Sequence, residues 1–245
     1  MTSLPTDGRT LDLDTYRALL VYLSAQGYSF PTFDEFHVDE PAARIALLRH
    51  DLDFSLEHAI PVAALEAELG IRSTYFIQVR SPLYNIASQR SQEILRHLQL
   101  LGHRLGLHSH VAPVDDPVNI VARDAEMVRL SGVEALLQVV SFHRMRQPLE
   151  QLKMLQVPPG WTHTYQPRYT TLLEYLSDST GRWCHGWPDR SAGFANGRGL
   201  QILTHPLWWV VEGATPVEKL LRLSHDAPDR MITDLEQTAV SFPLR

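Results

Sequence analysis

Two aspartates end an early apolar run of this sequence, and two carboxylates at this spacing could bind a metal ion or transfer a proton. The stretch "LLRHDLDFS" (47–55) ends its apolar part in an arginine, a histidine and the pair Asp51 and Asp53. One carboxylate of such a pair can hold a divalent metal while the other takes a proton from a water molecule that the metal activates. Alternatively, the two aspartates could only cap the helix that follows them.

Histidines close three further apolar runs. His108 and His110 end "GLHSH", His143 follows "VVSF", and His205 follows "QILT". Neutral imidazole is a frequent zinc ligand, so these residues are candidates for a metal site. His205 could instead give a proton to a leaving group or hold a product carboxylate. Five other histidines stand in polar or helical surroundings and are expected at the surface: His37, His58, His97, His163 and His225.

Alternating strands and helices must bring these run ends together. Short apolar runs predict the strands, and apolar residues at helical spacing predict the helices between them. Modules that alternate in this way indicate a parallel sheet or barrel, whose strands present their carboxyl ends at one common edge. The predicted strands cover residues 44–50, 71–79, 103–110 and 136–144, and the predicted helices cover residues 11–26, 55–69, 91–101 and 116–133.

The second half of the sequence is less regular. Residues 168–188 predict a short helix followed by a loop, residues 199–209 a further strand, and residues 216–227 a closing helix. No linker or low-complexity stretch divides the sequence. We therefore expect a single domain over residues 1–245, with a short helical extension at about residues 1–40.

The composition excludes several classes of protein. A net charge of −6 over 245 residues argues against sequence-independent binding of nucleic acid. The single cysteine, Cys184, cannot form an intramolecular disulfide. No apolar run approaches the ~18 residues of a membrane span, and the N-terminus lacks the pattern of a secretory signal. We expect a soluble, cytoplasmic protein without a nucleic-acid partner, and the oligomeric state stays open.

Four short motifs follow one another in a specific order between residues 44 and 209. They are "RHDLD" (49–53), "GIRSTYFI" (70–77), "GHRLGLHSH" (102–110) and "LTHPLWW" (203–209). In this order and spacing the chain resembles the polysaccharide deacetylase superfamily, the NodB-homology carbohydrate esterases. The segments "SFHR" and "YLSDSTGRW" further resemble a WbmS-like branch associated with surface-polysaccharide synthesis.

The resemblance implies a fold, an activity and a set of roles. The expected fold is an α/β, NodB-like distorted (β/α) barrel of about seven parallel strands. The implied activity is metal-dependent hydrolysis that removes an N- or O-acetyl group from a sugar, such as a polysaccharide precursor or a nucleotide-sugar. By position, Asp51 is similar to the general base, Asp53 and His108 to metal ligands, and His205 to the general acid.

The sequence departs from the pattern of the superfamily at two points. The second histidine of the usual ligand pair would fall at Ala112, so a third ligand must come from His143 or His110. We prefer His143, because its own strand end brings it in from a different direction. The usual "TFDDG" is replaced by "RHDLD" (49–53), which separates the two aspartates by a leucine. The expected cofactor is a divalent metal ion, with zinc the first choice.

Five further residues are predicted to contact the substrate. Arg49 and Arg144 could orient Asp51 or bind an anionic group, and tryptophan rings could stack on a sugar. The predicted contact residues are Arg49, Arg144, Asp178, Trp183 and Trp208.

Three alternatives stay open on the sequence. The first is a sugar-binding barrel without activity. The second is a cyclic-amide hydrolase that needs no metal. A glycosyltransferase that uses "DLD" to bind its metal is the third and fits the extra histidines least well.

Overall fold

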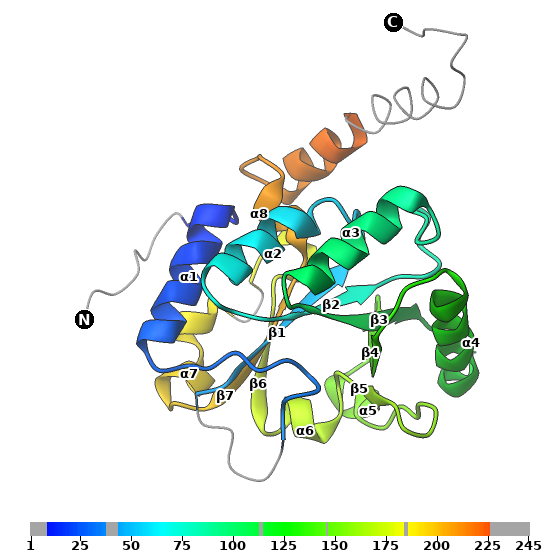
Figure 1. Cartoon of the computed structure of the whole chain (residues 1–245). Coiled ribbons are helices and arrows are strands. Elements are labelled where there is room, and N and C mark those ends of the chain that lie inside the picture. The colour runs from blue at the N-terminus through cyan, green and yellow to red at the C-terminus, as the bar shows by residue number, and fades with distance from the viewer. Residues whose placement is uncertain (1–8, 38–43, 113–114, 146, 184–185, 226–245) are drawn as a thin grey trace, which may run out of the picture.

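The computed structural model describes residues 9–37, 44–112, 115–145, 147–183 and 186–225 (Figure 1). Cys184 and the first eight residues of the predicted N-terminal extension lie outside these ranges, as do residues 38–40 at its end. Across the described residues, no helix is both long and apolar enough to cross a bilayer. The prediction of a single domain stays a prediction.

Seven parallel strands form one sheet that curls into an incomplete barrel (Figure 1). The spatial order is β5-β4-β3-β2-β1-β7-β6, so β1 lies near the middle and β5 and β6 form the two edges. This arrangement confirms the predicted distorted (β/α) barrel. The strands are β1 (Ala46–Leu52), β2 (Thr74–Ile77), β3 (Arg104–His110), β4 (Leu136–His143), β5 (Thr162–His163), β6 (Leu173–Ser177) and β7 (Gly199–Thr204).

Helices surround the outside of the sheet (Figure 1). Four of them match predicted helices: α1 (Leu13–Ala25), α2 (Ala59–Glu68), α3 (Gln89–Leu100) and α4 (Pro117–Leu130). The start of α4 follows the prediction, because Asp116 accepts a hydrogen bond from the Val118 amide and proline occupies the first turn. The shorter helices are α5 (Leu149–Leu152), α6 (Pro167–Thr170), α7 (Ala192–Ala195) and α8 (Pro206–Val210), and residues 216–225 are also helical.

Two predicted boundaries were wrong. The predicted strand over 199–209 stops at Thr204, because Pro206 begins α8, where its fixed backbone angle suits a first helical turn. The segment 168–188, predicted as a short helix and a loop, contains the strand β6 as well. β6 exists because it pairs with β7 along its whole length, from Leu173 to Ser177.

Side chains fill the barrel and bridge its open edge. Gln201 donates two hydrogen bonds, to the carbonyls of Thr164 and Tyr169, and so ties β7 to the segment between β5 and β6. Gly106 in β3 faces the ring of Phe76, which lies 2.6 Å from where a Cβ would stand. Any larger residue at position 106 would therefore displace that ring from the core.

A buried carboxylate lies behind β1, on the face that packs against α2. Glu66 accepts hydrogen bonds from the hydroxyls of Tyr16 at 2.6 Å, Ser73 at 2.7 Å and Tyr75 at 2.8 Å, and His50 Nε2 lies 2.8 Å away. Burial alone would raise the pKa of Glu66, but His50 above all lowers it to about 2. The network fixes the outer face of the strand whose inner face carries Asp51.

Candidate metal centre and active site

Three predicted ligands meet at the carboxyl end of the barrel. Asp53 directly follows β1, and His108 and His143 lie near the ends of β3 and β4. Asp53 Oδ1 lies 2.9 Å from His108 Nε2 and 3.1 Å from His143 Nδ1, and the two nitrogens lie 3.1 Å apart. The three ligand atoms thus form a nearly equilateral triangle.

This triangle fits a divalent metal ion. Ligand atoms on a tetrahedral zinc, with bonds of about 2.0–2.1 Å, lie roughly 3.3 Å apart, close to the distances found here. Hydrogen bonds alone suit the triangle poorly, because two N–H groups aimed at the same carboxylate oxygen would also face each other. A carboxylate with two imidazoles is a donor set of catalytic zinc sites, which leave a position for water or substrate. Within the described part of the chain, no other group of His, Cys, Asp or Glu brings three ligand atoms so close.

His110, the alternative third ligand, lies outside the triangle. His110 pairs with His143 in the register of β3 and β4, and the centroids of the two rings are 5.7 Å apart. His110 is exposed, whereas His143 turns its Nδ1 toward Asp53. The geometry therefore favours His143 over His110 as the ligand.

Asp51 points into the barrel and is held by Arg49. The guanidinium donates to both carboxylate oxygens, at 2.9 and 2.7 Å, and also to the hydroxyl of Thr164 at 2.8 Å. Burial would raise the pKa of Asp51, but the charge of Arg49 keeps that pKa below its usual value. Arg49 is fully buried. Of the two roles open to it, the position supports orienting Asp51 and does not fit direct contact with substrate.

His205 and Asp178 form a second buried pair at the same end of the barrel. Asp178 Oδ1 lies 2.7 Å from His205 Nδ1, and the Asp178 carboxylate also accepts the backbone N–H of His205. His205 Nε2 faces Asp53 Oδ2 at 3.6 Å. Burial alone would lower the pKa of His205, but the adjacent Asp178 carboxylate raises it to about 9. The histidine is therefore set up to carry a proton beside the ligand triangle.

This pair predicts a pH-dependent stability. A histidine whose pKa rises from about 6.5 to about 9 on folding stabilises the fold fully below pH 6.5, and this contribution is lost as the pH rises through 9. In chelator-treated protein, Asp178→Asn should remove this contribution. Wild type should then be more stable than the variant, as measured by unfolding in urea. This difference in the free energy of unfolding should be smaller at pH 10 than at pH 6 by on the order of 3 kcal/mol.

Asp124→Asn is the matched control for that measurement. Asp124 is also buried, but its charged partners are Arg80 and Arg123, which keep their protons throughout this pH range. Its stability curve should run parallel to that of wild type between pH 6 and pH 10. Parallel curves for Asp178→Asn as well would show that Asp178 does not raise the pKa of His205 in the folded chain.

Two predicted substrate contacts lie away from the opening. Asp178 is fully buried, and its carboxylate is occupied by His205 and by the indole N–H of Trp209 at 2.8 Å. Trp183 packs on Trp187 and Trp209 and lines a separate hollow of about 300 Å³. Neither position fits the prediction of direct contact with substrate.

A cavity of about 650 Å³ opens above the ligand triangle. Arg144 and Trp208, the other predicted substrate contacts, both line it. Trp208 meets Phe54 edge to face at 5.5 Å between ring centroids, and Val217 and Leu220 of the helical residues 216–225 extend this apolar wall. The Trp208 indole N–H has no hydrogen-bond partner among the described residues. The cavity thus has charged and polar residues at its base and largely apolar residues along one side.

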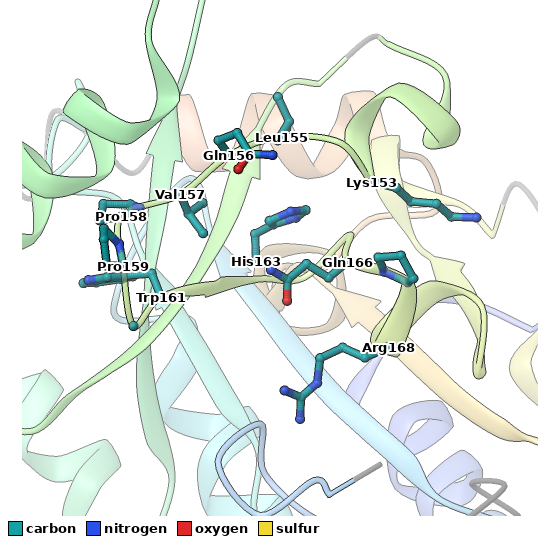
Figure 2. Close-up of a pocket in the computed structure, with 12 residues that line it drawn as sticks. Lys153, Leu155, Gln156, Val157, Pro158, Pro159, Trp161, His163, Gln166 and Arg168 are labelled. Atoms are coloured by element: carbon teal, nitrogen blue, oxygen red, sulfur yellow. The ribbon is translucent and has the colours of Figure 1, made fainter.

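His163 was wrongly predicted at the surface. It is fully buried in β5, and burial lowers its pKa to about 4. It lines a separate hollow of about 490 Å³ between residues 153–161 and α6, which Figure 2 shows with Val157 and Gln166 on either side of the imidazole. None of the active-site residues described above lines this hollow.

Sequence reasoning missed two polar residues of the barrel interior. Ser141 in β4 contacts both His108 and Asp51, and Thr164 accepts a hydrogen bond from Arg49. A signal for Ser141 was present, because it stands two residues before His143 on one strand and therefore faces the same side. Thr164 gave no such signal, because β5 was not predicted.

Comparisons with known proteins were made by sequence and by structure. No protein-family profile matches the chain, and no curated protein sequence matches it. The chain is similar in structure to the chitin deacetylase of the fungal pathogen Colletotrichum lindemuthianum, with a TM-score of 0.47 and 15% identity over 74% of this chain and 81% of that chain. It is also similar to a family 4 acetyl xylan esterase from Clostridium thermocellum in complex with a cobalt ion, with a TM-score of 0.38 and 17% identity over 79% and 90%.

A third similar structure is a CE4 family pseudoenzyme from Bacillus anthracis, with a TM-score of 0.41 and 10% identity over 78% of this chain and 63% of that chain. These neighbours include enzymes as well as a pseudoenzyme. With every TM-score below 0.5, such likenesses do not decide the function, which has to be argued from the site.

Proposed function

We propose that this chain is a metal-dependent carbohydrate deacetylase of the polysaccharide deacetylase superfamily. It would hydrolyse the acetamide or acetyl ester of an N- or O-acetylated sugar. One observation carries the proposal: a buried carboxylate, a ligand triangle and a histidine–aspartate pair converge at one mouth of the barrel. Hydrolysis of an acyl group needs a base, an electrophile and an acid at these relative positions.

Asp53, His108 and His143 would hold the metal ion, and zinc is the ion that we expect. A divalent ion held there supplies Lewis acidity, which acidifies a water molecule and polarises the acyl carbonyl. The side chain of Asp53 is well suited to this, because its Oδ1 lies within 3.1 Å of both imidazole nitrogens and can share one ion with them.

Asp51 acts as the general base in this proposal. Its ionised carboxylate accepts a proton from the attacking water, while the two hydrogen bonds from Arg49 hold its orientation. His205 acts as the general acid. Its Nε2 faces the ligand triangle, and Asp178 stabilises the protonated ring, so His205 can give a proton to the departing sugar amine or hydroxyl.

The cavity supports a sugar with an apolar face as substrate. A volume of about 650 Å³ lies within the range of small-ligand sites and suits one or a few sugar units. Trp208 and Phe54 offer an aromatic wall, and the exposed Arg144 at the rim could bind an anionic group. These features favour a polysaccharide precursor or a nucleotide-sugar, and we extend the proposal to a role in surface-polysaccharide synthesis.

The proposal is tested by measuring metal content and acetate release together. Protein purified without chelator should contain about one divalent ion per chain and release acetate from N-acetylated oligosaccharides or nucleotide-sugars. Chelation should abolish acetate release, and added zinc or cobalt should restore it. A sugar-binding barrel would bind saccharides without releasing acetate. A metal-independent cyclic-amide hydrolase would open a cyclic amide at an unchanged rate in EDTA, and either of these results would overturn the proposal.

A further inference from the structure

We propose that Ser141 is a positioning residue that couples the metal ligand His108 to the base Asp51 through one hydroxyl group. The inference rests on the proposed function and assigns a role to a residue of the same site. Ser141 lies in β4, directly across from His108 in β3, and is fully buried. Bulk water therefore does not reach it to replace either of the two partners that it contacts.

The contacts of Ser141 are asymmetric. Its Oγ lies 2.6 Å from His108 Nδ1 and 3.2 Å from Asp51 Oδ1. A hydroxyl carries one proton and can donate one hydrogen bond while it accepts another. Ionised Asp51, already bound by the Arg49 guanidinium, can only accept. The Ser141 proton must therefore point to Asp51, and the Ser141 oxygen must accept the N–H of His108.

This proton arrangement selects one tautomer of His108. With its proton on Nδ1, the neutral ring presents a lone pair at Nε2, which is the atom that faces Asp53 and His143. If Ser141 instead donated to Nδ1, the proton of His108 would sit on Nε2 and block ligation. The bond to Asp51 thus decides that His108 can bind a metal ion.

Among the described residues, no other acceptor is close enough to take over this role. The carboxylate oxygen of Asp51 nearest to His108 Nδ1 is Oδ2, at 3.6 Å, which is too long for a hydrogen bond. Without the hydroxyl, His108 would lose its tautomer preference, and Asp51 would lose one of its bonds. Metal affinity and the placement of the base should therefore fall together. Removing a hydrogen-bond partner of a metal ligand typically costs 10–100-fold in affinity.

The test compares four proteins by zinc affinity, measured by competition with a chromophoric chelator. Ser141→Ala should bind zinc roughly 10–100-fold more weakly than wild type. Ser141→Thr keeps the hydroxyl and should stay within a few-fold of wild type. Ser73→Ala is the matched control, because Ser73 is an equally buried serine that also donates to a carboxylate, Glu66, but on the other face of the sheet. Its zinc affinity should not change.

A second readout separates positioning from structure. At saturating zinc, Ser141→Ala should lower kcat for acetate release about 10-fold and leave KM unchanged. If Ser141→Ala does not fold, Ser141→Cys keeps the volume but is a weak donor and acceptor, and it should show the same loss of zinc affinity.

The proposed function and the role of Ser141 can fail independently of each other. If wild type binds zinc but releases no acetate, the proposed function fails, while the zinc affinities of the variants still test the role of Ser141. Wild-type zinc affinity in Ser141→Ala, or in Ser141→Cys where the alanine variant does not fold, would overturn the role of Ser141 and leave the proposed function standing. Wild-type protein without zinc affinity would overturn both.

Discussion

Asp51→Asn should lower kcat for acetate release by roughly 10³-fold, because an amide cannot take the proton of the attacking water. Zinc affinity should change little, since Asp51 is not one of the three ligand residues and the amide oxygen introduced by the substitution can still accept the hydrogen bond of Ser141. Acetate release at saturating zinc, together with a zinc titration of the same sample, measures both effects. A variant that turns over at nearly the wild-type rate would remove Asp51 as the base.

The same substitution should also destabilise the fold, and a double variant separates the two effects. Asp51→Asn leaves the Arg49 guanidinium buried without its carboxylate, which typically costs about 3–5 kcal/mol. Combining it with Arg49→Met removes the unpaired charge and should restore most of the free energy of unfolding, but none of the activity. Recovery of acetate release in the double variant would show that stability, rather than base chemistry, had been lost.

His143→Ala should weaken zinc binding by roughly 100-fold or more, because it deletes a ligand rather than a partner of one. His110→Ala is the matched control: His110 pairs with His143 in the sheet register and bears the same side chain, but it lies outside the ligand triangle. Its zinc affinity should stay within a few-fold of wild type. The reverse outcome, with zinc binding lost in His110→Ala and kept in His143→Ala, would make His110 the third ligand in place of His143.

The convergence of the site could be predicted because it depends on strand ends. Asp53, His108, His143 and His205 each close an apolar run, and parallel strands present such ends at one edge. Because alanine stands at position 112, the third ligand was sought outside the usual histidine pair. The choice between His110 and His143 rested on strand direction, and the geometry of the triangle now favours His143.

The second half resisted prediction because long-range pairing overrides local pattern. Leu172, Leu173 and Leu176 have helical spacing, yet this segment forms β6 because β7 offers it a neighbouring strand. His163 has polar sequence neighbours, and its burial arises only from pairing with β4 and from the segment that covers β5.

The depth of a polar residue could not be predicted from a motif. Asp178 stands in a segment similar to a branch signature and was placed against the substrate, whereas it lies beneath His205. Short polar side chains at strand ends can face either the opening or a partner below it, and local sequence does not distinguish the two.

Consecutive residues of β1 enter different polar networks on opposite sides of the strand. Arg49 and Asp51 pair inside the barrel, while His50 meets Glu66 outside it. A slip of one residue would turn the imidazole inward and push both charges of the inner pair against α2. Each group would then be buried away from its partner, at a cost of several kcal/mol. Misaligned pairings of this strand are therefore disfavoured during folding. The order arginine–histidine–aspartate in the sequence thus specifies the register of β1.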